Sequence, residues 1–230
     1  MCSPVKKVER KPLSHVLLCY VTDRNQFTGS EQDRQQRLLA KIAECGAAGV
    51  DYIQLREKDL GGGELEKLAR QAMDVLPASS PTRLLINSRV DVALAAGAHG
   101  VHLPANDLQP SDVRGIMMRA GVRRPIIGAS AHSIEEVAIA ESHGADFVAF
   151  APVFEKDAQP NPAGLARLHA VCRRINAADP PMPVLALGGV TAENAQKCVA
   201  AGAAGIAGIR VFQENAAAPL VEQLRSLVAR

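Results

Sequence analysis

Tryptophan is absent from this 230-residue chain and aromatic residues make up only 3% of it, so its core has to be built from aliphatic side chains. Hydrophobic residues nevertheless reach 47%, which suits closely packed layers of helix on sheet. An excess of either charge is also lacking, because 26 Lys and Arg oppose 24 Asp and Glu. A net charge of +2 provides no strong field for binding nucleic acid or an anionic membrane, and leaves neutral small molecules and small anions as ligands.

Cysteine is sparse and scattered along the chain. The five cysteines are odd in number and show neither a CxxC motif nor a Cys/His spacing typical of a metal site. We therefore expect reduced thiols and a cytoplasmic protein. Residues 1–12 are basic but are not followed by an apolar stretch long enough for a signal peptide or a membrane span. They are predicted to form a flexible tail on one catalytic domain of residues 13–230.

Eight apolar runs have the length and composition of buried strands. They are Val16–Val21, Val50–Leu55, Arg83–Ile86, Gly100–Leu103, Pro125–Gly128, Phe147–Phe150, Pro183–Leu187 and Gly205–Ile209. Segments with helical periodicity separate them, and strands alternating with helices indicate βαβ units and a parallel sheet. The chain length is typical of a small eight-fold barrel, so the predicted fold is α/β, a single (β/α)8 TIM barrel. A doubly wound open sheet is the alternative.

A phrase rich in Gly and Ala recurs about every 50 residues and supports the barrel. It occurs at residues 45–50, 96–101, 143–148 and 201–206, where a helix is expected to end and a strand to begin. Glycine accepts the left-handed conformation of a helix C-cap without a Cβ penalty, so each phrase is predicted to stop a helix. The spacing corresponds to two βα units of roughly 25 residues each, as expected for a barrel closed by repeated units.

The second apolar run continues directly into the charged residues Arg56, Glu57 and Lys58. Gln54, Arg56 and Lys58 share a parity, so an extended backbone would point all three side chains to one side. The reactive face of a β/α barrel lies at the carboxyl ends of its strands, where Asn87 also falls. We predict that these side chains form one wall of an anion site. A strand that frays into a solvated loop is the alternative.

Gly188 and Gly189, after the seventh run, have the composition of a phosphate cradle. Small residues let an oxyanion approach backbone N–H groups, and the helix that follows presents its positive end. Arg210 follows the eighth run, and barrels commonly bind phosphate after their seventh and eighth strands. Gly188, Gly189 and Arg210 are therefore predicted to bind a phosphate, with a merely tight turn as the alternative.

Proton-transfer and metal-binding candidates occupy other strand ends. His132 lies beside Ser130 after the fifth run, and histidine is the natural proton carrier near neutral pH. His102, in the fourth run, is either a ligand contact or part of the pocket floor. Asp107 offers the oxygen ligands that Mg²⁺ prefers, although it could equally pair with a basic residue. Glu155–Gly164 has the composition of an irregular loop, which is predicted to be mobile and could close over the site.

Six segments carry a specific ordered combination of motifs. They are Gln54–Lys58, Asn87–Asp91, Gly100–Leu103, Gly128–His132, Gly144–Val148 and Ala186–Thr191. Together they resemble the thiamine-phosphate synthase/TenI superfamily, over the second to the eighth predicted strand. The resemblance implies a β/α barrel that binds the thiazole phosphate precursor of thiamine. It also implies ligand positions of the synthase at Gln54, Arg56, Lys58, Asn87, Asp107 and Ser130.

The superfamily has two main activities. Its synthases use Mg²⁺ to couple a pyrimidine pyrophosphate to the thiazole phosphate, whereas the TenI branch aromatises a thiazole carboxylate phosphate by proton transfer. Three departures from the synthase pattern favour the TenI branch: Ser88 replaces a magnesium carboxylate, Glu155–Gln159 replaces a Thr-x-Thr-Lys segment, and Arg210 replaces a small hydroxyl residue. Lys58 and Asp107 are retained from the synthase pattern.

The resemblance therefore predicts an enzyme of thiamine biosynthesis, a TenI-like thiazole tautomerase in which His132 is the catalytic acid and base and no cofactor is needed. A thiamine-phosphate synthase that uses Mg²⁺, with Asp107 as a ligand, is the first alternative. A non-catalytic sensor of thiazole phosphate is the second. The expected partner is a small phosphorylated thiazole rather than nucleic acid or a membrane, and a homo-oligomer is left open.

Overall fold

The computed structural model of the protein describes residues 14–154, 164–175 and 181–227. Its strands form one closed parallel barrel in chain order, because β8 pairs with β1. They are β1 (Leu17–Val21), β2 (Tyr52–Leu55), β3 (Arg83–Asn87), β4 (Gly100–Leu103), β5 (Ile126–Ala131), β6 (Phe147–Phe150), β7 (Val184–Ala186) and β8 (Gly205–Gly208). The predicted (β/α)8 barrel is confirmed, and the open sheet is wrong.

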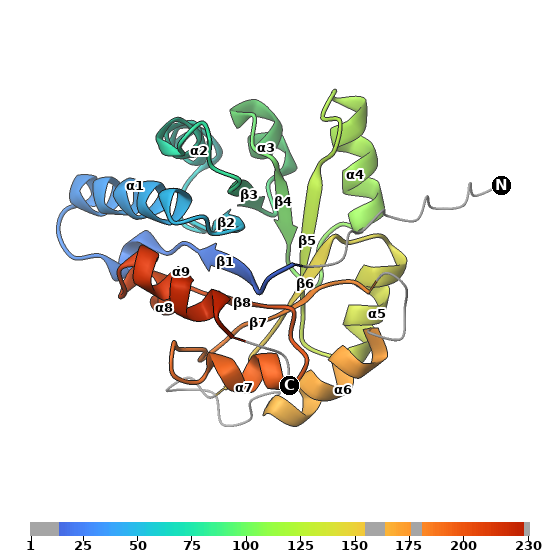
Figure 1. Ribbon diagram of the computed structural model, residues 1–230. Helices are drawn as coiled ribbons and strands as arrows, with labels where there is room; N and C mark the ends of the chain where they lie inside the picture. The colour runs from blue at the N-terminus through green and yellow to red at the C-terminus, as the bar shows by residue number, and fades with distance from the viewer. Residues whose placement is uncertain (1–13, 155–163, 176–180, 228–230) are drawn as a thin grey trace.

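Helices surround the barrel on its outside (Figure 1). They are α1 (Glu31–Ala47), α2 (Gly62–Val75), α3 (Val90–Ala96), α4 (Pro110–Arg119), α5 (Ile134–Ser142), α6 (Gly164–Ile175), α7 (Ala195–Ala200), α8 (Arg210–Gln213) and α9 (Ala217–Arg225), with a 3-10 helix, η1 (Arg24–Gln26), after β1. Within the described ranges, no helix is long and apolar enough to cross a membrane. The predicted tail 1–12 and residues 155–163 of the predicted loop lie outside the described residues.

Two apolar clusters follow from the alternation of side chains along each strand. One fills the barrel interior and consists of Leu17, Cys19, Val21, Leu85, Phe147, Leu185 and Ala207. The other, much larger, lies between the outer face of the strands and the helices. The inward-facing parity also includes Gln54, Asn87 and Ser130, which stand nearer the carboxyl ends. The barrel interior is therefore apolar towards the amino ends of the strands and polar at their carboxyl ends.

The glycine phrases end helices as predicted. Each supplies one glycine with a positive φ where a helix gives way to a strand: Gly49 (+80°), Gly97 (+67°), Gly144 (+74°) and Gly202 (+97°). The predicted end of the fifth strand, at Gly128, is wrong. β5 continues to Ala131 because Ser130 pairs with Ala149 and Ala131 pairs with Phe150 of β6. Ser130 consequently belongs to the strand itself, which fixes its direction.

Candidate active site

Two adjoining pockets open at the carboxyl ends of the strands. The central pocket, of about 570 Å³, is lined by residues that follow or end most of the strands. The glycine-turn pocket, of about 910 Å³, lies over the turns after β7 and β8. Gln26, Leu187, Gly188 and Ile209 line both pockets, so the two adjoin.

The central pocket brings together most of the residues that the sequence identified. Seven of them line it: Gln54, Arg56, Lys58, Asn87, Ser130, His132 and Gly188. Gln54, Arg56 and Lys58, whose side chains were predicted to point to one side, therefore line the same cavity. The Nε2 of Gln54 donates to the Oδ1 of Asn87 at 3.2 Å, which orients both amides and leaves the Gln54 oxygen and the Asn87 nitrogen for a ligand.

Arg56 and Lys58 provide positive charge in this pocket. Arg56 is half-buried and Lys58 is exposed. Across the part of the chain that the structure describes, neither side chain forms an ion pair or a hydrogen bond with a protein group. Two cations without a protein partner in a partly enclosed cavity form a site to which an anion is attracted.

The glycine-turn pocket is built around a turn whose conformation favours glycine. Gly188 and Gly189 both have left-handed φ values, +93° and +64°, and a Cβ on Gly188 would lie 2.8 Å from the Cα of Pro152. Asn194 braces the turn, since it accepts from the N–H of Thr191 at 2.8 Å and donates to the carbonyl of Gly189 at 2.9 Å. A nest of this kind suits an oxyanion such as phosphate.

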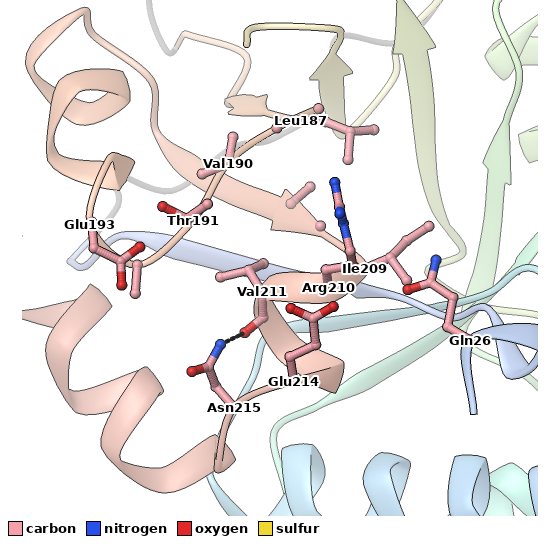
Figure 2. Close-up of a pocket in the computed structure, with 15 residues that line it drawn as sticks. Gln26, Leu187, Val190, Thr191, Glu193, Ile209, Arg210, Val211, Glu214 and Asn215 are labelled. Carbon is pink, nitrogen blue, oxygen red and sulfur yellow. Dashed lines mark hydrogen bonds between the residues drawn. The ribbon is translucent and has the colours of Figure 1, made fainter. Parts of the chain in front are cut away.

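Arg210 lies on the other side of the glycine-turn pocket (Figure 2). Its side chain is exposed and has no hydrogen bond or ion pair with another described residue. Glu193 and Glu214 also line the pocket, but neither carboxylate pairs with Arg210. The structure thus brings together the three residues predicted to bind phosphate, Gly188, Gly189 and Arg210.

His132 is exposed beside the central pocket and has a defined tautomer. Its Nδ1 lies 2.8 Å from the carbonyl oxygen of Ala151, and a carbonyl can only accept, so Nδ1 carries the proton. Its main-chain N–H donates to Oε2 of Glu136 at 2.6 Å, and Ser133 caps α5 by accepting from the N–H of Glu136 at 3.2 Å. With the proton on Nδ1, Nε2 is the ring atom that can accept a proton.

His102 occupies the pocket floor rather than the ligand surface. Its side chain is 2% exposed and is not among the residues that line the central pocket, so the predicted direct contact with substrate is not what the structure shows. Its Nε2 lies 2.9 Å from the Oγ of Ser130, whereas its Nδ1 is buried without a partner. Burial lowers the pKa of His102 to about 4, and the charge of Arg56 acts in the same direction. The ring is neutral at physiological pH and supports Ser130.

Asp107 lines neither of the two pockets and is bonded to Ser88, the residue after Asn87. The Ser88 hydroxyl donates to its Oδ2, and the N–H of Leu108 donates to its Oδ1 at 2.8 Å. Among the described residues, no group of three or more His, Cys, Asp or Glu could hold a metal ion. One carboxylate and one hydroxyl are nevertheless hard oxygen donors, and they suit Mg²⁺ that takes its remaining ligands from water and substrate phosphates.

Several lining residues were not identified from the sequence. Gln26 lines both pockets from η1, and Asp23 orients it by accepting from its Nε2 at 2.9 Å. Pro104, Ala105 and Ile209 supply apolar walls. Gln26 lies five residues beyond the end of β1, so it is not among the polar residues at the strand ends. The signal available was the Asx-type turn at Asp23, which bends the chain back over the barrel.

The protein is a β/α barrel with two adjoining pockets at the carboxyl ends of its strands, where enzymes of this fold have their active sites. A family model described as "Thiamine monophosphate synthase" (TMP-TENI) matches residues 19–212. The chain belongs to this family of enzymes, as the resemblance of its motifs predicted. The match covers every strand that contributes to the site except the first two residues of β1.

Known relatives agree with the family. "Putative thiamine-phosphate synthase 2" of Aquifex aeolicus is 40% identical over 196 residues, covering 84% of this chain and 96% of the relative. The thiamine-phosphate synthase of Methanoculleus marisnigri is 38% identical over 196 residues, covering 83% and 87%. Among solved structures, the thiamine phosphate pyrophosphorylase from Pyrococcus furiosus matches with a TM-score of 0.73 and 28% identity, covering 92% of this chain and 95% of that one.

Proposed function

We propose that the protein is an enzyme of thiamine biosynthesis, a thiamine-phosphate synthase that couples a pyrimidine pyrophosphate to a thiazole phosphate. The observation that carries the proposal is the pair of adjoining pockets, one with two cations that pair with no described residue and one with a glycine turn. Two anionic substrates can lie side by side in them. The names of the relatives support this reaction, which was the alternative to the tautomerase in the sequence-based prediction.

The reaction requires one bond to break and one to form. The bond between the pyrimidine methylene carbon and its pyrophosphate oxygen breaks, the electron pair leaves with pyrophosphate, and the thiazole nitrogen donates a pair to the carbon. Arg56 and Lys58 would stabilise the charge that grows on the leaving group. Gly188, Gly189 and Arg210 would hold the thiazole phosphate, and the amides of Gln54 and Asn87 with the Ser130 hydroxyl would orient the pyrimidine.

Magnesium fits this proposal as an ion bound largely by the substrate. Asp107 and the Ser88 hydroxyl would hold it, and when bound it would neutralise pyrophosphate charge. The residues of the chain itself perform the remaining tasks: they bind both anions, align the thiazole nitrogen with the methylene carbon and exclude water from the bond that forms.

One pair of incubations tests the proposal. Purified protein receives thiazole phosphate, pyrimidine pyrophosphate and Mg²⁺ in one reaction, and the thiazole carboxylate tautomer in the other. Formation of thiamine phosphate in the first is the expected result. Aromatisation of the carboxylate in the second, without thiamine phosphate in the first, would contradict the synthase. Binding without turnover in either would favour the sensor.

A thiazole tautomerase is the second candidate, and the geometry of His132 favours it. The imidazole is exposed at the pocket with Nδ1 bonded to Ala151, so Nε2 can accept a substrate proton. The presence of Ser88 where a synthase carboxylate is expected points the same way. A proton transfer by one histidine is worth roughly 10²–10⁴-fold. His132→Ala should then lower tautomerase turnover by that factor with binding nearly intact, and an unchanged rate would remove His132 from the mechanism.

A further inference from the structure

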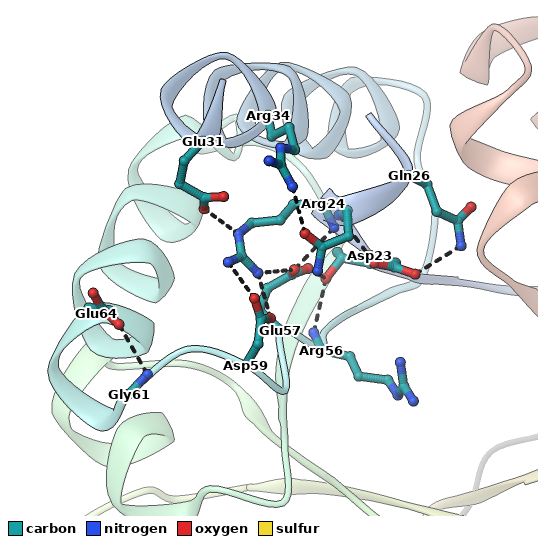
Figure 3. A network of polar contacts seen from close by, with 12 residues as sticks. Asp23, Arg24, Gln26, Glu31, Arg34, Arg56, Glu57, Asp59, Gly61 and Glu64 are labelled. Atoms are coloured by element: carbon teal, nitrogen blue, oxygen red, sulfur yellow. Dashed lines mark hydrogen bonds and ion pairs between the residues drawn. The ribbon is translucent and has the colours of Figure 1, made fainter. Parts of the chain in front are cut away.

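One buried guanidinium holds the turn that presents Arg56 and Lys58. Arg24 is 4% exposed, and its Nη1 and Nη2 donate to the two carboxylate oxygens of Asp59, at 2.7 Å each. Its Nη1 and its main-chain N–H also donate to Oε2 of Glu57, at 3.1 and 3.0 Å. Figure 3 shows the guanidinium among these carboxylates. Because Glu57 and Asp59 flank Lys58, a single side chain fixes the residues on both sides of that lysine.

The hydroxyl of Thr22 extends this network to Arg56. It donates to Oε1 of Glu57 at 2.6 Å and accepts from the main-chain N–H of Arg56 at 2.9 Å. Thr22 is completely buried, and Glu57 is 4% exposed. A buried carboxylate that is bonded on both oxygens has one favourable position, because leaving either oxygen unpaired is costly. The peptide at Arg56 is therefore oriented from beneath by Thr22 and Glu57.

The same network occupies three carboxylates that lie near the turn of Arg56 and Lys58. The carboxylates of Glu31, Glu57 and Asp59 all converge on Arg24. Without that guanidinium, Glu57 and Asp59 would be free to pair with the neighbouring Arg56 or Lys58 and to neutralise the charge that an anion meets. Arg24 thus affects both the orientation of Arg56 and Lys58 and their availability to an anion.

We propose that Arg24 is a positioning residue for the anion site, which holds Glu57 and Asp59 so that Arg56 and Lys58 face an anionic group in the central pocket. The inference rests on the proposed function, in which that group is the pyrophosphate of the pyrimidine substrate. Arg24 does not line either pocket. It acts through the main chain of the turn that carries the two cations.

The variant Arg24→Gln tests the proposal. Its binding of the pyrimidine substrate, in the central pocket, is compared with its binding of the thiazole phosphate, at the glycine turn. We expect affinity for inorganic pyrophosphate, measured by calorimetry, to fall roughly tenfold or more, and KM for the pyrimidine substrate to rise in parallel. KM for the thiazole phosphate should not change, because the network does not reach the glycine turn. A merely structural role would lower the melting temperature without separating the two KM values.

Two further variants serve as comparisons. Arg24→Lys keeps the charge but loses the planar fork that grips Asp59, and it should bind pyrophosphate little better than Arg24→Gln. Arg70→Gln removes the same charge from the exposed face of α2, where Arg70 pairs with Glu66 at 2.9 Å, and should behave like the unaltered protein. Thr22→Val removes only the hydroxyl between Glu57 and Arg56, and should weaken pyrophosphate binding roughly threefold or more.

Wild-type affinity in folded Arg24→Gln would overturn the positioning role. If Arg24→Gln does not fold, wild-type affinity and KM values in Thr22→Val would overturn it instead. An unaltered protein that binds pyrophosphate but forms no thiamine phosphate would contradict the proposed reaction alone, and the comparison of variants would still decide the role of Arg24. An unaltered protein that binds no pyrophosphate would contradict the inference itself.

Discussion

Near the amino ends of the strands, Arg114 and Arg225 each bond several protein groups. Arg114 donates to the carbonyls of Pro125 and Gly144 and to the carboxylate of Asp146. Arg225 likewise donates to the carbonyls of Val16 and Gly49 and to Asp51. At the carboxyl ends, by contrast, Arg56 and Arg210 bond no other described residue through their side chains. Arg114 and Arg225 therefore brace the fold at one end, whereas Arg56 and Arg210 are available to a ligand at the other.

The largest effect should come from removing a cation of the carboxyl-end face. Arg56→Met is expected to lower kcat/KM for the coupling reaction roughly 100-fold to 1,000-fold, because the leaving pyrophosphate loses a charged partner. The melting temperature should stay unchanged, since the Arg56 side chain bonds no described group. Steady-state kinetics and calorimetry on one preparation measure both. A fall in stability without a fall in kcat/KM would reverse the assignment.

Arg114→Met is the matched change at the amino-end face. Its loss leaves two carbonyls and the Asp146 carboxylate each short of a hydrogen-bond donor. The side chains of the Arg114–Asp146 ion pair are about one fifth exposed, at 22% and 23%. We expect a loss of roughly 2–3 kcal/mol in the free energy of unfolding, below the value for a fully buried pair. Urea denaturation provides the measurement. The surviving folded fraction should have an unchanged kcat/KM, and a kinetic defect would break the contrast between the faces.

The buried histidine between the two faces should make stability depend on pH. The pKa of His102 is about 4 in the folded protein against an ordinary value of 6.5, so the unfolded chain takes up a proton first as the pH falls. The stability that depends on a neutral His102 is fully present above pH 6.5 and is lost as the pH drops towards 4. The free energy of unfolding should decrease by roughly 2 kcal/mol between about pH 7 and about pH 5. His102→Asn does not titrate there, and an equally steep pH profile in that variant would exclude His102 as the cause.

The smallest expected effect is a gain at the carboxyl-end face. Ser88 has a φ of +63°, a conformation that Asp tolerates better than most residues. Ser88→Asp places a second carboxylate beside Asp107 and should raise Mg²⁺-dependent coupling several-fold with little change in stability. Titration of the rate with Mg²⁺ measures this. A lower rate at every Mg²⁺ concentration would show that the Ser88 hydroxyl itself is required.

Much of the barrel and of its polar rim could be predicted from local patterns. The alternation of apolar runs and the glycine phrases identified all eight strands, because period and C-cap chemistry are properties of neighbouring residues. Parity grouped Gln54, Arg56 and Lys58, which do line one pocket. Strand direction is likewise why the glycine turn and Arg210 could be placed together.

How deeply a side chain is buried, and which distant residues it bonds, could not be predicted in the same way. Parity indicates that His102 faces inward but not that Phe147 and Ser130 cover it, since this depends on strands that the local sequence does not describe. No local pattern distinguishes Arg24. Its burial requires Glu31, Glu57 and Asp59, which come from two other segments and meet only after the barrel closes.

The closeness of the two pockets has a consequence for inhibition. Gln26, Leu187, Gly188 and Ile209 form a boundary that the pocket of the cation pair shares with the pocket of the glycine turn. One molecule that carries a pyrophosphate mimic at one end and a phosphate at the other could occupy both pockets at once. Binding of its second end would be intramolecular, at an effective concentration in the millimolar range for a short flexible linker. Two weak anions joined in this way would make a tight ligand.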